Sequence, residues 1–140
     1  MTTRSMVVPA KLDEVEPICG AIDEEAVSAG FDEHTNYACQ LAVCEAFENI
    51  VIHGYRGKLD GQVAIKITAR PGELVVQLDD SAPPFNPATA PPDTPAVHDP
   101  PAGGLGLRIM HRVMDEIEYQ RRPAGNTLTM RKVQDKADSP

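Results

Sequence analysis

The sequence predicts an α+β protein, a two-layer α/β sandwich in which helices pack against a mixed, mostly antiparallel sheet. Apolar residues recur at helical spacing between about 11 and 53, whereas from 62 onward the chain contains short segments in which apolar and polar residues alternate, as in strands. These strand-like segments come as two hairpins, one before and one after a further helical segment, so helices come first and hairpins follow. At 140 residues the chain is expected to form a single domain over 1–133.

The N-terminal half is expected to hold a short strand and two helices. Residues 4–8 are apolar enough for a strand, and 11–29 show helical spacing. Gly30 suits a helix end because glycine adopts the left-handed conformation found there. Asp32 is a good N-cap for a second helix, which we expect to continue to about His53.

The C-terminal half is expected to supply most of the sheet. A Pro71-Gly72 turn joins the first two of its strands into a hairpin, and Pro123-Ala124-Gly125 joins the last two. We expect residues 134–140 to be a disordered tail. The elements predicted here are strands at 62–69, 73–79, 116–121 and 127–133, and a third helix at 104–114.

Charge and composition exclude several classes of function. The net charge of −8 argues against nucleic acid or an anionic membrane as the main partner. No secretory signal and no apolar stretch of membrane-spanning length is visible. The cysteines Cys19, Cys39 and Cys44 are odd in number and form no CxxC, so we expect buried thiols rather than a disulfide or a zinc site. These features predict a cytoplasmic protein.

Residues 80–103 differ in composition from the rest of the chain. They contain eight of the thirteen prolines and no glycine before Gly103. Proline cannot continue a helix interior or a central strand, and a loop this long within a compact domain is usually functional or disordered. We predict a lid at about 87–102, closed by the glycine-rich segment that follows.

Three polar residues interrupt the second predicted helix at steps of four: Glu45, Asn49 and His53. On an α-helix such a step rotates only about 40°, so the three side chains form one row. A buried carboxylate or amide must have polar partners. One interpretation is the solvated edge of an amphipathic helix; the other is a functional row.

Two other segments can be interpreted as parts of a ligand site. LDDSAPPF (78–85) ends a predicted strand in an acidic pair, which can accept a hydrogen bond from an exocyclic amine or simply form a turn. GGLGLRIM (103–110) opens a predicted helix. Its glycines permit close backbone approach to a phosphate, although glycines also occur in ordinary loops. No P-loop motif occurs.

Taken together and in this order, the three segments resemble the GHKL superfamily of ATPases and kinases, which has the Bergerat ATP-binding fold. The resemblance is to the anti-sigma-factor serine/threonine kinases of sporulation and stress-response switches. Their E-A-x-x-N-x-x-x-H-x-Y corresponds to EAFENIVIHGY (45–55), D-x-G-x-P-F to DSAPPF (80–85), and G-G-x-G-L to GGLGL (103–107), with M-D-E at 114–116. The resemblance covers nearly the whole chain. It departs at Ala82, where the family usually has glycine, so we expect a slightly altered pocket.

The resemblance implies ATP and Mg²⁺ as cofactors and a role for each polar residue. Asn49 is implied to ligate Mg²⁺, which needs few protein ligands, and Glu45 to orient or deprotonate the attacking hydroxyl. Asp80 is implied to accept from the adenine amino group, with Ala82 beside it. His53 is expected to be structural. The residues implied to bind nucleotide on the glycine-rich segment are Gly103, Gly104, Leu105, Gly106 and Leu107. Thr127 and Thr129 alternate toward one face of the sheet, and we expect Thr129 to be near the adenine.

The function implied by the resemblance is phosphorylation of a serine or threonine on an anti-anti-sigma (STAS-domain) protein. The implied second partner is a sigma factor or another effector that the kinase sequesters, and a homodimer is the implied assembly. The alternative is a nucleotide-dependent binding module that sequesters a partner without phosphorylating it. Glu45 favours the kinase, because nucleotide binding alone needs no base.

Overall fold

The fold is known from a computed structural model that describes residues 1–56, 60–84 and 102–134, without the side chains of 102–107. Within these residues five strands form one sheet in the order β1-β2-β3-β5-β4, and every neighbouring pair is antiparallel. The strands are β1 (Thr2–Pro9), β2 (Gln62–Arg70), β3 (Glu73–Asp80), β4 (Glu116–Arg122) and β5 (Gly125–Val133). The helices are α1 (Val15–Ser28), α2 (Glu33–Asn49) and α3 (Ala102–Val113).

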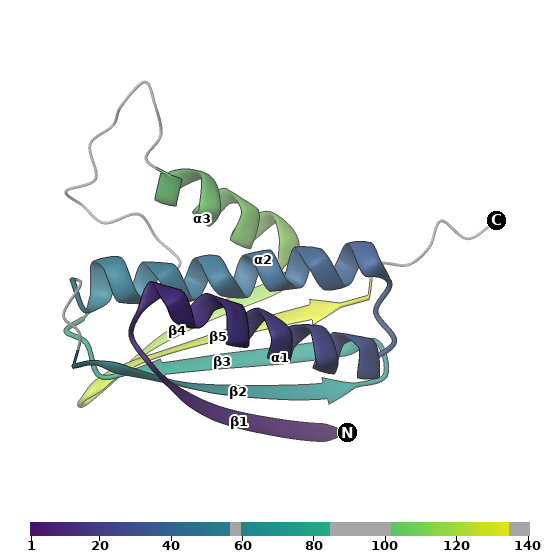
Figure 1. The fold of residues 1–140 in the computed structure, drawn as a ribbon, viewed down its shortest axis with the longest axis horizontal. Helices are drawn as coiled ribbons and strands as arrows, with labels where there is room; N and C mark the ends of the chain where they lie inside the picture. The colour runs from purple at the N-terminus through teal and green to yellow at the C-terminus, as the bar shows by residue number, and fades with distance from the viewer. Residues whose placement is uncertain (57–59, 85–101, 135–140) are drawn as a thin grey trace.

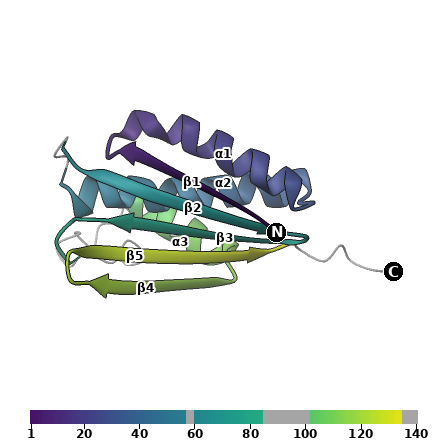
Figure 2. The ribbon, with the colours of Figure 1, turned by 90° about the horizontal axis from the view of Figure 1, so that it is seen from below.

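All three helices cover the same face of the sheet, so the protein is the expected two-layer α+β sandwich (Figure 1). In Figure 2, which looks from below, the strands lie in front of α2 and α3. α2 packs against both α1 and α3. The core lies between the layers and includes the fully buried Ile22 and Phe47 from the helices and Ile67, Leu78 and Leu128 from the sheet.

The helix boundaries follow from local chemistry that the sequence already showed. Gly30 has φ +82°, the left-handed conformation that ends α1. The Asp32 carboxylate caps α2 by accepting from the backbone N–H of Thr35 at 2.7 Å. Gln134 binds the same cap, since its amide donates to Asp32 Oδ2 at 2.8 Å and accepts from the Asp32 N–H at 2.9 Å. Gln134 is therefore held in place, while the rest of the predicted tail lies outside the described residues.

Helix ends differ from the prediction in two places. A 3₁₀ turn, η1 (Leu12–Glu14), precedes α1, so the predicted helix at 11–29 begins as a tighter turn. The second helix does continue to the region of His53, but its last part is a π-helix, η2 (Ile50–Gly54). The i+4 row predicted for an α-helix therefore applies to Glu45 and Asn49 and not to His53.

Two of the three cysteines lie side by side. The sulfur atoms of Cys19 in α1 and Cys44 in α2 are in contact, with Cα atoms 6.8 Å apart, and Cys39 is free and buried. Burial raises the pKa of the Cys39 thiol to about 12. The proximity of Cys19 and Cys44 could not be read from their sequence spacing, because it depends on how α1 and α2 face each other; that they are thiols stays a prediction.

Two glycine substitutions are expected to have opposite effects on stability. A methyl group at Gly125 would overlap the carbonyl oxygen of Asp80 and lie 2.9 Å from its carbonyl carbon. Gly125→Ala should therefore lower the free energy of unfolding by about 1–3 kcal/mol or more. A methyl group at Gly20, within α1, would meet nothing within 4 Å, so Gly20→Ala should raise it by roughly 0.5–1 kcal/mol. Denaturant unfolding measures both, and a stable Gly125→Ala protein would contradict the close approach.

Candidate functional site

Asp80 is the buried acidic residue at the end of β3. Its side chain is only 3% exposed, and it lies on the helix-covered face of the sheet, whereas Asp79 lies on the opposite face. The Asp80 Oδ1 atom accepts two hydrogen bonds, from the Ala82 N–H at 2.9 Å and from the Asn126 amide at 2.7 Å. These are the side-chain hydrogen bonds that the described residues give Asp80, and both are made to the same oxygen. Oδ2 is therefore the atom available for a ligand.

Asn126, which the sequence analysis did not single out, is the central residue of this cluster. It is 1% exposed and pairs with Asp80 in the register of β3 and β5. Its amide nitrogen also donates to the carbonyl oxygens of Ala82 and Pro83, each at 3.2 Å. Its amide oxygen accepts from the Tyr119 hydroxyl. The available signal was weak, because an asparagine after Pro-Ala-Gly is typical of a turn.

Two arginines of β4 hold the backbone around the cluster. Arg121 Nη1 donates to the carbonyl oxygens of Ala82 at 3.1 Å and Gly125 at 3.0 Å. Arg122 Nη2 donates to the carbonyl oxygen of Asp80 at 2.8 Å. Burial raises the pKa of the Asp80 carboxyl, and the Asn126 hydrogen bond, the Ala82 N–H and the two guanidinium groups oppose that rise.

Ala82 stands where the resembling family usually has glycine, and it is buried within the Asp80 cluster. It is 2% exposed, and both its backbone groups are bonded within the cluster. The alanine therefore fits into the packed turn after β3 without leaving a backbone group unpaired.

α2 carries the other two predicted residues. Asn49, the last residue of the α-helical part, is 4% exposed, and Glu45, one turn earlier, is half-buried. Burial raises the pKa of the Glu45 carboxyl, and the negative charge of Glu48 raises it further. A raised pKa makes the ionised carboxylate a stronger base, which suits proton transfer.

Tyr55 ties the end of η2 to the end of β3. Its hydroxyl donates to the Gln62 carbonyl oxygen at 2.6 Å and accepts from the Ser81 N–H at 2.8 Å. Since Ser81 directly follows Asp80, the C-terminal end of α2 and the Asp80 cluster lie at the same end of the protein. The structure thus brings the first two sequence segments together.

The glycine-rich segment 103–107 lies in the first turns of α3, which begins at Ala102, two residues earlier than predicted. α3 runs antiparallel to α2, and its first turn lies over the C-terminal half of α2 (Figure 1). Free backbone N–H groups at a helix start favour a phosphate. Apart from Ala102, the predicted lid at 87–102 lies outside the described residues.

Thr127 and Thr129 are not part of the cluster. Leu128 and Met130 point into the core, so the threonines between them lie on the opposite face of the sheet from Asp80. Thr129 pairs with Gln77, and the Thr127 hydroxyl donates to Asp79 Oδ1 at 2.6 Å. The expectation that these threonines lie beside Asp80 is therefore withdrawn, and Asn126 is the β5 residue that donates to Asp80.

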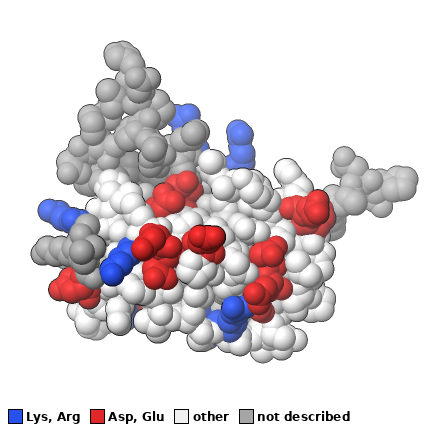
Figure 3. Space-filling model, in the orientation of Figure 1, with Lys and Arg blue, Asp and Glu red and all other residues white. Residues whose placement is uncertain are grey.

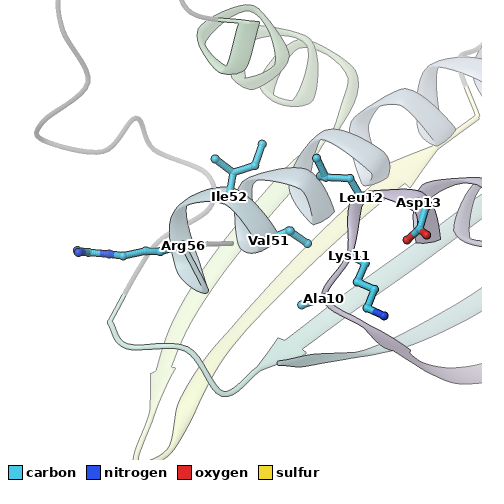
Figure 4. A pocket seen from close by; sticks show the side chains of 7 residues that line it. All are labelled: Ala10, Lys11, Leu12, Asp13, Val51, Ile52 and Arg56. Atoms are coloured by element: carbon cyan, nitrogen blue, oxygen red, sulfur yellow. The ribbon is translucent and has the colours of Figure 1, made fainter. Parts of the chain in front are cut away.

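A separate pocket of about 610 Å³ opens between η2 and the segment that leads from β1 through η1. Figure 4 shows its lining, which comes from residues 10–13 on one side and from Val51, Ile52 and Arg56 on the other. Glu45, Asn49 and Asp80 do not line it. We therefore do not assign this pocket to the predicted ligand.

The surface of the protein is rich in acidic residues (Figure 3). Acidic side chains are prominent on the face shown in Figure 3, and α1 carries four acidic residues and no basic one. Among the described residues, no helix is long and apolar enough to cross a membrane.

A family model for the histidine kinase-like ATPase domain matches residues 8–132. The chain therefore belongs to the histidine kinase-like ATPase family, the GHKL type that the sequence motifs indicated. The match includes Glu45, Asn49, Asp80 and Asn126.

Within this family the chain is similar to named serine kinases. It is 33% identical over 135 residues to the serine-protein kinase RsbW of Bacillus pumilus, covering 91% of this chain and 83% of the relative. It is 29% identical over 96 residues to the serine/threonine-protein kinase BtrW of Bordetella bronchiseptica, covering 67% and 68%. An anti-sigma F factor of Clostridium botulinum is 29% identical over 102 residues, covering 66% and 67%.

Solved structures support the fold. The structure of the RsbU and RsbW domains of Rv1364c from Mycobacterium tuberculosis aligns with a TM-score of 0.66 at 16% identity. The alignment covers 95% of this chain and 32% of that longer chain. A histidine kinase domain from Erythrobacter litoralis aligns with a TM-score of 0.53 at 19% identity, covering 92% and 63%.

Proposed function

We propose that the protein is an ATP-dependent serine/threonine kinase that phosphorylates an anti-anti-sigma protein of the STAS type. We further propose that it sequesters a sigma factor or another effector and alternates between the two partners. The observation that carries the nucleotide part is the buried Asp80 carboxylate, whose Oδ1 is held by Ala82 and Asn126 while Oδ2 is left for a ligand. The named kinases among its relatives support the choice of reaction, and the similar anti-sigma F factor supports a sigma factor as one partner. A homodimer remains a prediction.

The residues present fit Mg-ATP. The described residues include no group of three or more His, Cys, Asp or Glu side chains that could hold a metal ion by themselves. That suits Mg²⁺, which usually takes one or two protein ligands and completes its sphere with phosphate oxygens and water. We assign the single protein ligand to the Asn49 amide oxygen. The first turn of α3, with Gly103, Gly104 and Gly106, would face the phosphates, with Leu105 and Leu107 in the same segment.

The reaction needs little more from the protein than alignment and one base. Mg-ATP, when bound, supplies the phosphoryl group and the neutralising charge. Glu45 would orient the serine hydroxyl of the partner and accept its proton. Asp80 would orient the adenine through a hydrogen bond from the exocyclic amine to Oδ2.

Asp80→Asn tests the nucleotide site. The amide of the substituted side chain would have only one acceptor end. In one orientation its NH₂ group faces the Ala82 and Asn126 donors, and in the other it faces the adenine amine, so in either case two donors oppose each other. Because a hydrogen bond to a charged acceptor contributes roughly 1.5–3 kcal/mol, we expect ATP affinity to fall about tenfold or more. Calorimetry measures this.

Asp79→Asn is the matched control, since Asp79 lies one residue away on the opposite face and bonds Thr127 and Gln77. It should bind ATP as the wild type does. Unchanged affinity in Asp80→Asn would exclude the adenine role of Asp80.

A second candidate function is a nucleotide-dependent binding module that sequesters its partner without phosphorylating it. Ala82 favours the binding module, because this alanine replaces the family's usual glycine next to Asp80, within the proposed nucleotide site. Incubation with labelled ATP and a candidate STAS partner distinguishes the two functions. A kinase would transfer the label to the partner, whereas a binding module would bind ATP and the partner without any transfer.

A further inference from the structure

We propose that Asn126, positioned by Tyr119, sets the nucleobase specificity of the site by keeping Asp80 a pure hydrogen-bond acceptor, so that 6-amino purine nucleotides bind and 6-oxo purine nucleotides are rejected. This inference rests on the proposed function, because it presumes that the base binds at Asp80. It adds a positioning residue to the Asp80 site that the sequence motifs did not include.

The orientation of the Asn126 amide follows from its partners. Its oxygen accepts from the Tyr119 hydroxyl and, at 3.4 Å, from Arg121 Nη1. Its nitrogen faces three acceptors: Asp80 Oδ1 and the carbonyl oxygens of Ala82 and Pro83. A reversed amide would place oxygen against oxygen and nitrogen against the Arg121 donor. The NH₂ group therefore points at Asp80.

This orientation determines what Asp80 can do. Oδ1 accepts from both the Ala82 N–H and the Asn126 NH₂. Two donors directed at one carboxyl oxygen stabilise the ionised form more than the neutral acid, and the ionised form has no proton on either oxygen. The ionised Asp80 therefore presents Oδ2 as an acceptor. It matches the 6-amino group of adenine, a donor, and opposes the 6-oxo group of hypoxanthine or guanine, an acceptor.

Without Asn126 the Asp80 carboxyl loses one of the hydrogen bonds that stabilise its ionised form. Burial favours the neutral carboxylic acid, and the Asn126 hydrogen bond is the first of the influences that oppose it. The charged groups that act on Asp80 in the described residues are Arg121 and Arg122 of β4; β2 pairs Val63 with it, and β5 contributes the neutral Asn126. A protonated Asp80 can donate from Oδ2 to a 6-oxo group, so discrimination should fall.

The experiment compares the affinities of ATP and inosine triphosphate, which differ in the 6-substituent. For the wild type we expect ATP to bind about tenfold or more tightly. Asn126→Leu removes the donor at similar volume and should lower that ratio, most strongly at low pH, where the ATP complex should also be weaker. Asn126→Asp places a second carboxyl beside Asp80, which raises one pKa strongly, and should have the same effect near neutral pH.

The control is Gln120→Leu, the same kind of substitution at an exposed position of β4. It should keep the wild-type ratio. Tyr119→Phe removes only the hydroxyl that orients the amide, and should lower the ratio by a smaller factor; it also keeps the inference testable should either Asn126 variant fail to fold. Thermal melting identifies folded variants.

The outcomes separate this inference from the proposed function. A wild type that binds ATP through Asp80, with a ratio unchanged in the folded Asn126 and Tyr119 variants, overturns the role of Asn126 and leaves the nucleotide site standing. A wild type that binds neither nucleotide overturns both. A ratio that falls in the Asn126 variants, falls by a smaller factor in Tyr119→Phe and holds in Gln120→Leu supports the inference.

Discussion

Glu45→Gln is expected to slow phosphoryl transfer to the partner by about 10²–10⁴-fold while ATP affinity and partner binding stay at wild-type levels. The substitution keeps the shape of the side chain and removes its ability to accept a proton. Glu45 is half-buried one turn before Asn49, and its nearest charged neighbour on the helix is Glu48. The measurement is single-turnover transfer from labelled ATP, with affinities from calorimetry.

Glu48→Gln is the matched control, because it makes the same change three residues away. It should also shift the pH profile of phosphoryl transfer. Burial and the Glu48 charge both raise the pKa of Glu45, and a base works only when ionised, so transfer should be lost as the pH falls through that raised pKa. Removing the Glu48 charge lowers the Glu45 pKa and should move the acid limb to lower pH without abolishing transfer. Wild-type rates in Glu45→Gln would remove the catalytic assignment.

Asn49→Ala is expected to abolish the dependence of ATP affinity on Mg²⁺ and to eliminate transfer with it. Asn49 supplies the one protein oxygen that we assign to the metal, at a buried position on the last turn of the α-helical part. ATP titrations with and without Mg²⁺ should therefore coincide in this variant and differ in the wild type. Glu45 and Asn49 are one turn apart, so their effects are expected to couple.

Asn36→Ala makes the same substitution at the other end of α2. Asn36 is also buried, and its amide donates to Asp23 Oδ1 at 2.7 Å, so the change costs stability without touching the site. Asn49→Asp restores an oxygen ligand and should recover the Mg²⁺ dependence. A Mg²⁺ response that persists in a folded Asn49→Ala protein would exclude Asn49 as the ligand.

The sequence was sufficient for the architecture and for the residues whose spacing is local. The change from helical to alternating periodicity predicted the two layers, and Gly30 and Asp32 predicted the break between α1 and α2. Asp80 was indicated by its place in an acidic pair at a strand end. Which member of the pair is buried follows from the register, which leaves Asp79 on the outer face.

What could not be predicted depends on contacts between distant segments. Asn126 meets Asp80 only because β5 pairs with β3 across an intervening helix and strand, which no local pattern shows. The proximity of Cys19 to Cys44 likewise depends on how two helices are rotated against each other. The error at Thr129 was avoidable, because Leu128 and Met130 already indicated that the core face of β5 excludes the threonines.

The central claim is that this site transfers a phosphoryl group to a protein hydroxyl. A STAS-domain partner recovered by ATP-dependent pull-down from the native cell extract provides the substrate. Incubated with Mg²⁺ and ATP labelled on the γ-phosphate, the wild-type protein should place one label on a serine or threonine of that partner, and Glu45→Gln should place almost none over the same time. A partner that binds in the presence of ATP but remains unlabelled by the wild-type protein would contradict the kinase and leave the binding module.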